Sequence, residues 1–117
     1  MDIRVQDLNR FKGGQIEIKS PSGRICRGEI ESIQMDKKIS LTVTIAWAGE
    51  MKDGVWVYDP ELTSYKFPLY KFEAADLMFG RIVFMGHPSY DHDLVILFPK
   101  NGECIKPSDV QGLAIAA

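Results

Sequence analysis

The chain has 117 residues, of which 45% are hydrophobic and 26% are charged, and its formal net charge is −2. These values are ordinary for one globular domain, and they lack the basic excess of a dedicated duplex-binding protein. No apolar segment is long enough to span a bilayer, and residues 1–11 contain no leader-like apolar run. We therefore expect a single cytoplasmic domain over residues 1–117 with no membrane partner.

The N-terminal residues predict a short helix over residues 1–12. Val5, Leu8 and Phe11 recur at a helical spacing, and Gly13-Gly14 follows as a stop signal. The next segment, residues 15–20, alternates in the manner of a strand, and the Pro-Ser-Gly sequence that comes after it is typical of a turn.

Residues 24–35 predict a long strand with a bend in it. Ile30 and Ile33 lie on opposite parities, so the apolar phase slips between them, as it does at a β-bulge. Gly28 is a position where a strand can bend sharply, because it has no side chain to collide with a neighbour. Asp36-Lys37 then predicts a tight hairpin.

Residues 38–48 carry the clearest periodicity in the chain. Small and polar residues alternate there with five apolar ones, namely Ile39, Leu41, Val43, Ile45 and Trp47. A period of two indicates a half-buried strand of an antiparallel sheet. A meander whose middle strand bends is the usual beginning of a small curved barrel. We therefore predict an all-β fold with one or two short helical turns, built as a small, strongly bent antiparallel barrel that is similar in architecture to SH3-like barrels.

The second half of the chain predicts shorter elements. In order they are a loop over 49–54, a strand over 55–58, and an edge strand or extended linker over 65–72 that contains Pro68. A helical turn over 73–78, strands over 80–85 and 94–98, a hairpin at Asn101-Gly102 and an apolar tail over 107–117 follow. The strands over 80–85 and 94–98 are apolar on both faces, so both faces require a cover. A helix, the tail or a second copy of the chain can supply it, which leaves a structural subunit of a homo-oligomer as one alternative.

Aromatic side chains cluster in the middle of the sequence. The candidate groove residues are Trp47, Trp56, Tyr58, Tyr65 and Tyr70. Aromatic rings at strand ends offer large contact area at low entropic cost, although such rings also pack over barrel ends as core. The leading interpretation is a non-catalytic binding module that presents this groove to a peptide or protein partner.

Basic residues favour a second interpretation. Residues 1–38 hold eight basic against six acidic side chains, whereas the rest of the chain is acidic. The candidate basic face comprises Lys12, Lys19, Arg24, Arg27, Lys37 and Lys38. Such residues can hold a nucleic-acid backbone while aromatic rings stack on bases, so binding of RNA or single-stranded DNA is the alternative.

The sequence supports a metal site or a catalytic site less well than it supports a binding surface. Four candidate metal ligands, His87, Asp91, His92 and Asp93, lie within one segment, which is also typical of a polar loop. Cys26 and Cys104 belong to no redox motif, although Cys104 near a histidine would form a thiol dyad. With no phosphate-binding loop or nucleophile motif, we expect no cofactor and no catalysis.

Overall fold

The computed structural model describes residues 8–37, 39–69, 72–78, 80–86, 93–100 and 105–112, and of residues 72–78 it describes the backbone. The predicted all-β class is confirmed. Its elements are η1 (Asn9–Phe11), β1 (Gln15–Lys19), β2 (Ile25–Asp36), β3 (Ser40–Lys52), β4 (Val55–Tyr58), β5 (Ser64–Pro68), β6 (Phe72–Met78), β7 (Arg81–Gly86), β8 (Leu94–Phe98) and η3 (Pro107–Asp109). Both η elements are single 3-10 turns.

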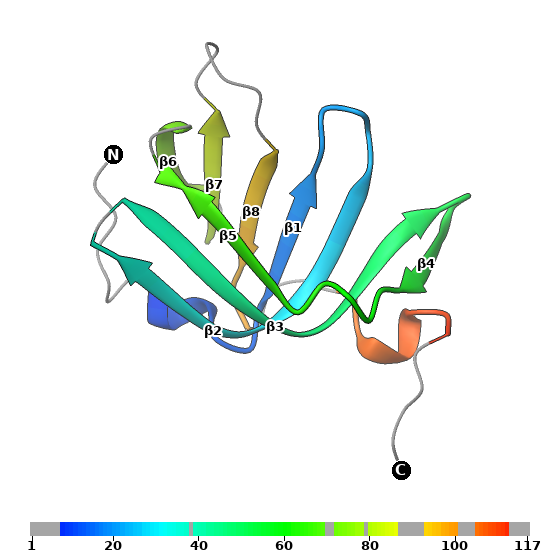
Figure 1. Ribbon diagram of the computed structural model, residues 1–117. Coiled ribbons are helices and arrows are strands. Elements are labelled where there is room, and N and C mark those ends of the chain that lie inside the picture. The colour runs from blue at the N-terminus through cyan, green and yellow to red at the C-terminus, as the bar shows by residue number, and fades with distance from the viewer. Residues whose placement is uncertain are drawn as a thin grey trace.

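The strands form one curved antiparallel sheet in the order β4-β3-β2-β1-β8-β7-β6 (Figure 1). β5 lies off this path and pairs with the first half of β3, whereas β4 pairs with its second half. Closure would require β5 to pair with β6, and these two described strands do not pair. The predicted closed barrel is therefore wrong, and the comparison with SH3-like barrels loses its basis with it. The sheet is open, with a concave face and a convex face.

The bend in β2 is confirmed. The register between β2 and β3 shifts on both sides of Ile30, which is where the apolar phase slips in the sequence. A Cβ at Gly28 would lie 2.5 Å from Ile45 Cγ2 and 2.8 Å from the backbone oxygen of Trp47. The absence of a side chain at Gly28 thus lets β3 lie against β2 at the point where the pair begins to curve.

β3 follows the predicted alternation over Leu41, Val43 and Ile45, and it extends further than predicted. Trp47, predicted on the same face, lies on the convex face instead, because the register shift beside Ile30 leaves one extra residue of β3 between Ile45 and Trp47. Leu41 and Val43 are fully buried on the concave face, whereas Ile39 lies before the strand and is 60% exposed. Residues 49–52 continue the strand, so the predicted loop over 49–54 is wrong. Asp53-Gly54 forms the turn, with φ values of +51° and +79° that match a two-residue type I′ hairpin.

The predicted helical turn over residues 73–78 is also wrong, since this segment forms β6. It pairs along its length with β7, with one register shift near its start. The sequence Glu-Ala-Ala-Asp-Leu-Met consists mainly of good helix formers, but local propensity is a weak preference that sheet pairing overrides.

The core lies on the concave face of the sheet. Its largest fully buried side chains are Phe11, Phe84, Ile16, Ile30, Leu41, Leu97, Val43 and Val95. Leu8 and Phe11 face inward as predicted, and their turn η1 immediately precedes β1. β1 begins next to η1 and runs away from it to Lys19. The last residues of β1 therefore lie at the end of the concave face that is remote from η1. Val5 and the rest of residues 1–7 lie outside the described part.

The C-terminal segment lies against the sheet as far as it is described. The Gln15 side chain bonds to both the N–H and the carbonyl oxygen of Ile105. Gln111 then forms a parallel bridge with β4: its N–H donates to Trp56 O at 2.7 Å, and its carbonyl accepts from Tyr58 N at 2.9 Å. The start of the tail therefore lies along β4, whereas residues 113–117 and the predicted hairpin at Asn101-Gly102 lie outside the described residues.

Candidate binding site

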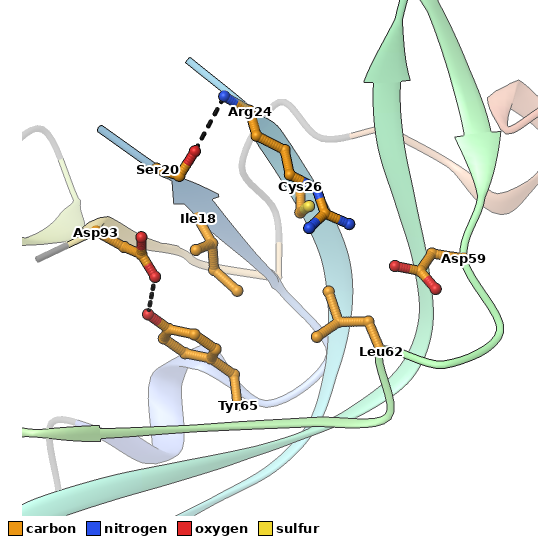
Figure 2. Close-up of a pocket in the computed structure, with 8 residues that line it drawn as sticks. All are labelled: Ile18, Ser20, Arg24, Cys26, Asp59, Leu62, Tyr65 and Asp93. Carbon is orange, nitrogen blue, oxygen red and sulfur yellow. Dashed lines mark hydrogen bonds between the residues drawn. The ribbon is translucent and has the colours of Figure 1, made fainter. Parts of the chain in front are cut away.

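A pocket of about 230 Å³ lies on the concave face, at the end where β1 finishes (Figure 2). Four segments meet around it: the β1–β2 turn with its flanking strand residues, the β4–β5 connection, the start of β5, and the residue before β8. The residues that line it are Ile18, Ser20, Arg24, Cys26, Asp59, Leu62, Tyr65 and Asp93. We call this site the mouth pocket.

The rim of the mouth pocket is organised by local hydrogen bonds. Ser20 Oγ accepts the backbone N–H of Arg24 at 3.0 Å, which tightens the β1–β2 turn. Asp59 Oδ1 accepts the backbone N–H of Glu61 at 3.0 Å, in the manner of an Asx turn. These contacts hold the two turns on either side of the opening (Figure 2).

Tyr65 and Asp93 close one side of the pocket. The Tyr65 hydroxyl donates to Asp93 Oδ2, a contact that joins β5 to the start of β8 across the open part of the sheet. Burial, together with this hydrogen bond to a carboxylate, raises the pKa of Tyr65 far above its usual value. The hydroxyl is therefore protonated at neutral pH and acts as a donor.

Cys26 contributes a half-buried thiol to the pocket wall. Burial is the main cause that raises its pKa. The neighbouring Arg24 lowers it, whereas Glu50, Asp59 and Asp93 raise it. The thiol is therefore protonated at neutral pH and lacks the thiolate character of a nucleophilic cysteine.

Arg24 stands at the rim and is bound to Glu50. Its Nε lies 2.5 Å from Glu50 Oε1, and its Nη2 lies 3.2 Å from Oε2. The Arg24 side chain is 57% exposed. Its pKa is raised, first by the hydrogen bond to Glu50, so the guanidinium is always charged.

The predicted aromatic groove residues do not lie on one face. Trp56 and Tyr58 are half-buried on the convex face, because the register places Tyr58 opposite Gly49 and Gly49 opposite Arg27. Trp47 is also on the convex face, opposite Glu29, and is only 8% exposed. Tyr65 lies instead in the mouth pocket, and Tyr70 lies outside the described residues.

Trp47 and the concave pocket are thus separate features of the fold. The Trp47 Nε1 donor is buried and has no partner among the residues that the structure describes. With 8% of its surface exposed, Trp47 packs on the convex side of the sheet.

A stack of aromatic and charged side chains occupies the convex face. The Arg27 guanidinium lies over the rings of Trp56 and Phe98, at 5.9 and 4.9 Å from their centroids. Arg81 lies over the same Phe98 ring at 4.8 Å, and Glu17 accepts from Arg27 Nε at 2.9 Å. Phe98 lies on the convex face of β8 and is 2% exposed. The two guanidinium groups therefore cover part of the second apolar face of this strand. We call this set the convex stack.

The predicted basic residues are dispersed or paired. Arg24 and Arg27 bind Glu50 and Glu17, respectively. Lys37 lies in the hairpin at the far end of β2 from Arg24, so these two cations lie at opposite ends of a 12-residue strand. Lys12 and Lys19 are exposed, and Lys38 lies outside the described residues.

Of the predicted metal ligands, the structure places Asp93 alone, in the mouth pocket, whereas His87, Asp91 and His92 lie outside the described part. Within the described ranges, no group of three or more histidine, cysteine, aspartate and glutamate side chains is arranged to hold a metal ion. Cys104 also lies outside these ranges.

No pattern in the sequence marks Ser20, Asp59 or Leu62 as site residues. Ser20 and Asp59 carry ordinary turn signals, and a lone Leu62 between two strands has no periodicity to mark it. Their convergence depends on how the β1–β2 and β4–β5 connections meet at the end of the sheet, which no local pattern encodes.

No family model, curated protein or solved structure matches this chain. No helix among the described residues has the length and apolar character required to cross a membrane.

Proposed function

We propose that the protein is a non-catalytic binding module. It takes an extended segment of a protein partner along the edge of β5 and seats one side chain of that segment in the mouth pocket. The observation that carries this proposal is the position of the pocket, whose lining includes Tyr65 of β5 itself.

The edge of β5 supports an extended partner. Leu69 N–H donates to Ile39 O at 2.8 Å, next to the β3–β5 ladder. Since bonded and non-bonded pairs alternate along an antiparallel ladder, Tyr65 and Phe67 are the residues of β5 whose backbone groups bond to β3. The side chains of these same two residues face the concave side, where Tyr65 reaches the pocket.

By the same alternation, the backbone groups of Ser64 and Lys66 point away from β3. Both residues are exposed, and no described strand pairs with this edge. Pro68 also lies on the outward register, where its missing N–H removes no bond to β3. A short extended peptide can therefore pair with Ser64 and Lys66 as an added strand, and the lysine and proline limit longer edge-to-edge association.

The chemistry of the pocket supports binding rather than turnover. The Cys26 thiol and the Tyr65 hydroxyl are both held protonated by the burial that raises each pKa. The pocket combines an apolar wall with a few placed polar groups, which is the usual make-up of a recognition pocket.

The test uses blocked pentapeptides of the form Thr-Val-X-Val-Thr, whose residues favour strands, with norleucine as a neutral X. Titration is followed by the backbone amide NMR signals of residues 62–66. We expect saturable shifts and protection of the Cys26 thiol from alkylation, localised by mass spectrometry.

Lys66→Pro and Lys66→Ala form a matched pair of variants. Both remove the lysine side chain, but the proline also removes the outward backbone N–H while leaving the bonds to β3 in place. We expect Lys66→Pro to weaken peptide binding about tenfold, since one hydrogen bond is lost, and Lys66→Ala to have almost no effect. Equal effects of the two variants, or no amide shifts with any peptide at millimolar concentration, would overturn the proposal.

A further inference from the structure

We propose that the side chain taken by the mouth pocket is a basic one, a lysine or arginine of the partner segment. This inference rests on the proposed function and names the chemistry of its ligand. It follows from the charges and the shape of the pocket lining.

Carboxylates outnumber cations in the described lining. Asp59 and Asp93 both line the pocket, against one guanidinium, that of Arg24. Arg24 is already held by Glu50 through two contacts, and Glu50 also lies 3.8 Å from Lys52 Nζ, so the charge of Arg24 is partly matched before any ligand arrives. The described lining itself carries two carboxylates against this one guanidinium, which favours an entering cation.

Asp59 can accept a further donor. Its Oδ1 accepts the Glu61 N–H, while the Asp93 Oδ2 accepts the Tyr65 hydroxyl. A carboxylate has about four lone-pair sites, so the contact with Glu61 orients Asp59 without exhausting its acceptors. The ammonium of a lysine has three donors to offer and the guanidinium of an arginine has five.

The pocket wall matches the stem of such a side chain. Ile18, Cys26 and Leu62 supply apolar surface, while the carboxylates lie on two sides of the opening (Figure 2). Lysine and arginine bury their methylene groups along apolar surface and keep the charged end near polar groups. A volume of about 230 Å³ is suited to one long side chain.

The Cys26 thiol supports this distribution of charge. Glu50, Asp59 and Asp93 all raise its pKa through their charges, against the opposing effect of Arg24. These three carboxylates therefore act on the same small volume of the pocket.

The experiment compares Thr-Val-X-Val-Thr peptides in which X is lysine, arginine, norleucine or glutamate. Norleucine has the length of lysine without its charge. We expect the lysine or arginine peptide to bind at least about fivefold tighter than the norleucine peptide, the glutamate peptide to bind more weakly than norleucine, and the preference to fall as salt is added.

Asp59→Asn and Asp36→Asn form the matched pair of variants. Both remove one negative charge, and an asparagine at 59 still has a side-chain carbonyl that can accept from Glu61 N–H. Asp36 lies at the end of β2 remote from the pocket. We expect Asp59→Asn to abolish most of the preference for the basic peptide over norleucine, and Asp36→Asn to leave it within about twofold.

The outcomes separate the two proposals. If basic and norleucine peptides bind equally and Lys66→Pro weakens both, the proposed function holds and the basic ligand is overturned. If Asp59→Asn and Asp36→Asn reduce the preference equally, the effect comes from overall charge and the pocket assignment is wrong. If no peptide binds, the proposed function fails first.

Discussion

Arg24 and Arg27 are three residues apart, yet they serve opposite faces of the sheet. Each pairs with one glutamate, and the N–O distances are 2.5 Å for Arg24 and 2.9 Å for Arg27. The Arg24 side chain is 57% exposed at the rim of the mouth pocket, whereas that of Arg27 is 23% exposed within the convex stack. Distance alone would rank the two pairs in the wrong order of importance for stability.

Their surroundings explain the difference. Water screens an exposed ion pair, which contributes little to folding. Arg27 lies over two rings as well as binding Glu17, so its guanidinium combines a planar stacking surface with charge. Arg27 thus stabilises the fold on the convex face, whereas Arg24 remains accessible at the rim of the mouth pocket.

The largest expected effect comes from removing the Arg27 side chain. Arg27→Ala leaves the Glu17 carboxylate without its partner and uncovers Phe98, so we expect a loss of about 2 kcal/mol in the free energy of unfolding. Arg27→Lys keeps the charge but not the planar stack and should lie between alanine and wild type. Urea unfolding followed by tryptophan fluorescence measures both.

Arg24→Ala is the matched control for this comparison. Because the side chain is exposed, we expect no measurable change in the urea midpoint. Midpoints that fall equally for the two alanine variants would show that the contrast between the faces does not exist.

The sequence predicted best where one strand carries its own signal. The alternation of Leu41, Val43 and Ile45 fixes both a strand and its buried face, and the phase slip after Ile30 marks the bulge. In both places the information is local, because side-chain parity and sheet face are the same property. Asp53-Gly54 is also a local hairpin signal, but the predicted loop over 49–54 includes residues 49–52, which are the end of β3.

The sequence did not predict the features that depend on contacts between distant segments. Residues 73–78 favour a helix locally, and their pairing with β7 decides otherwise. Barrel closure depends on whether β5 meets β6, which periodicity within either strand cannot reveal. The mouth pocket is not predictable for the same reason: Ser20 belongs to the β1–β2 connection, Asp59 and Leu62 belong to the β4–β5 connection, and the two meet at the end of the sheet.

A smaller effect, confined to the concave face, is expected from Tyr65→Phe. The variant loses the hydrogen bond to Asp93, so we expect a loss of about 1 kcal/mol at neutral pH. The pKa of Tyr65 is raised in the folded state, so the hydroxyl contributes stability below its unfolded pKa of about 10 and loses that contribution as the pH rises further.

The pH dependence gives this prediction its control. Urea midpoints measured from about pH 8 to pH 11 should converge for wild type and Tyr65→Phe, because only the wild type loses the contribution of this hydroxyl as the pH rises. Arg27→Ala should show no such convergence. A gap between wild type and Tyr65→Phe that stays constant across this range would contradict the role assigned to the Tyr65–Asp93 contact.

The smallest expected effect is a gain in binding from Arg24→Gln. The variant removes the guanidinium at the rim of the mouth pocket and leaves Glu50 paired with Lys52, so the lining becomes more negative while the fold is unchanged. We expect the lysine pentapeptide to bind about twofold to fivefold tighter and the norleucine pentapeptide to bind as before, as measured by NMR titration. Arg27→Gln changes the net charge equally but lies on the other face, so it should leave both affinities unaltered at a temperature where it stays folded. A gain from both variants would mean that the peptides respond to the overall charge of the protein, and the assignment of separate tasks to the two faces would fail.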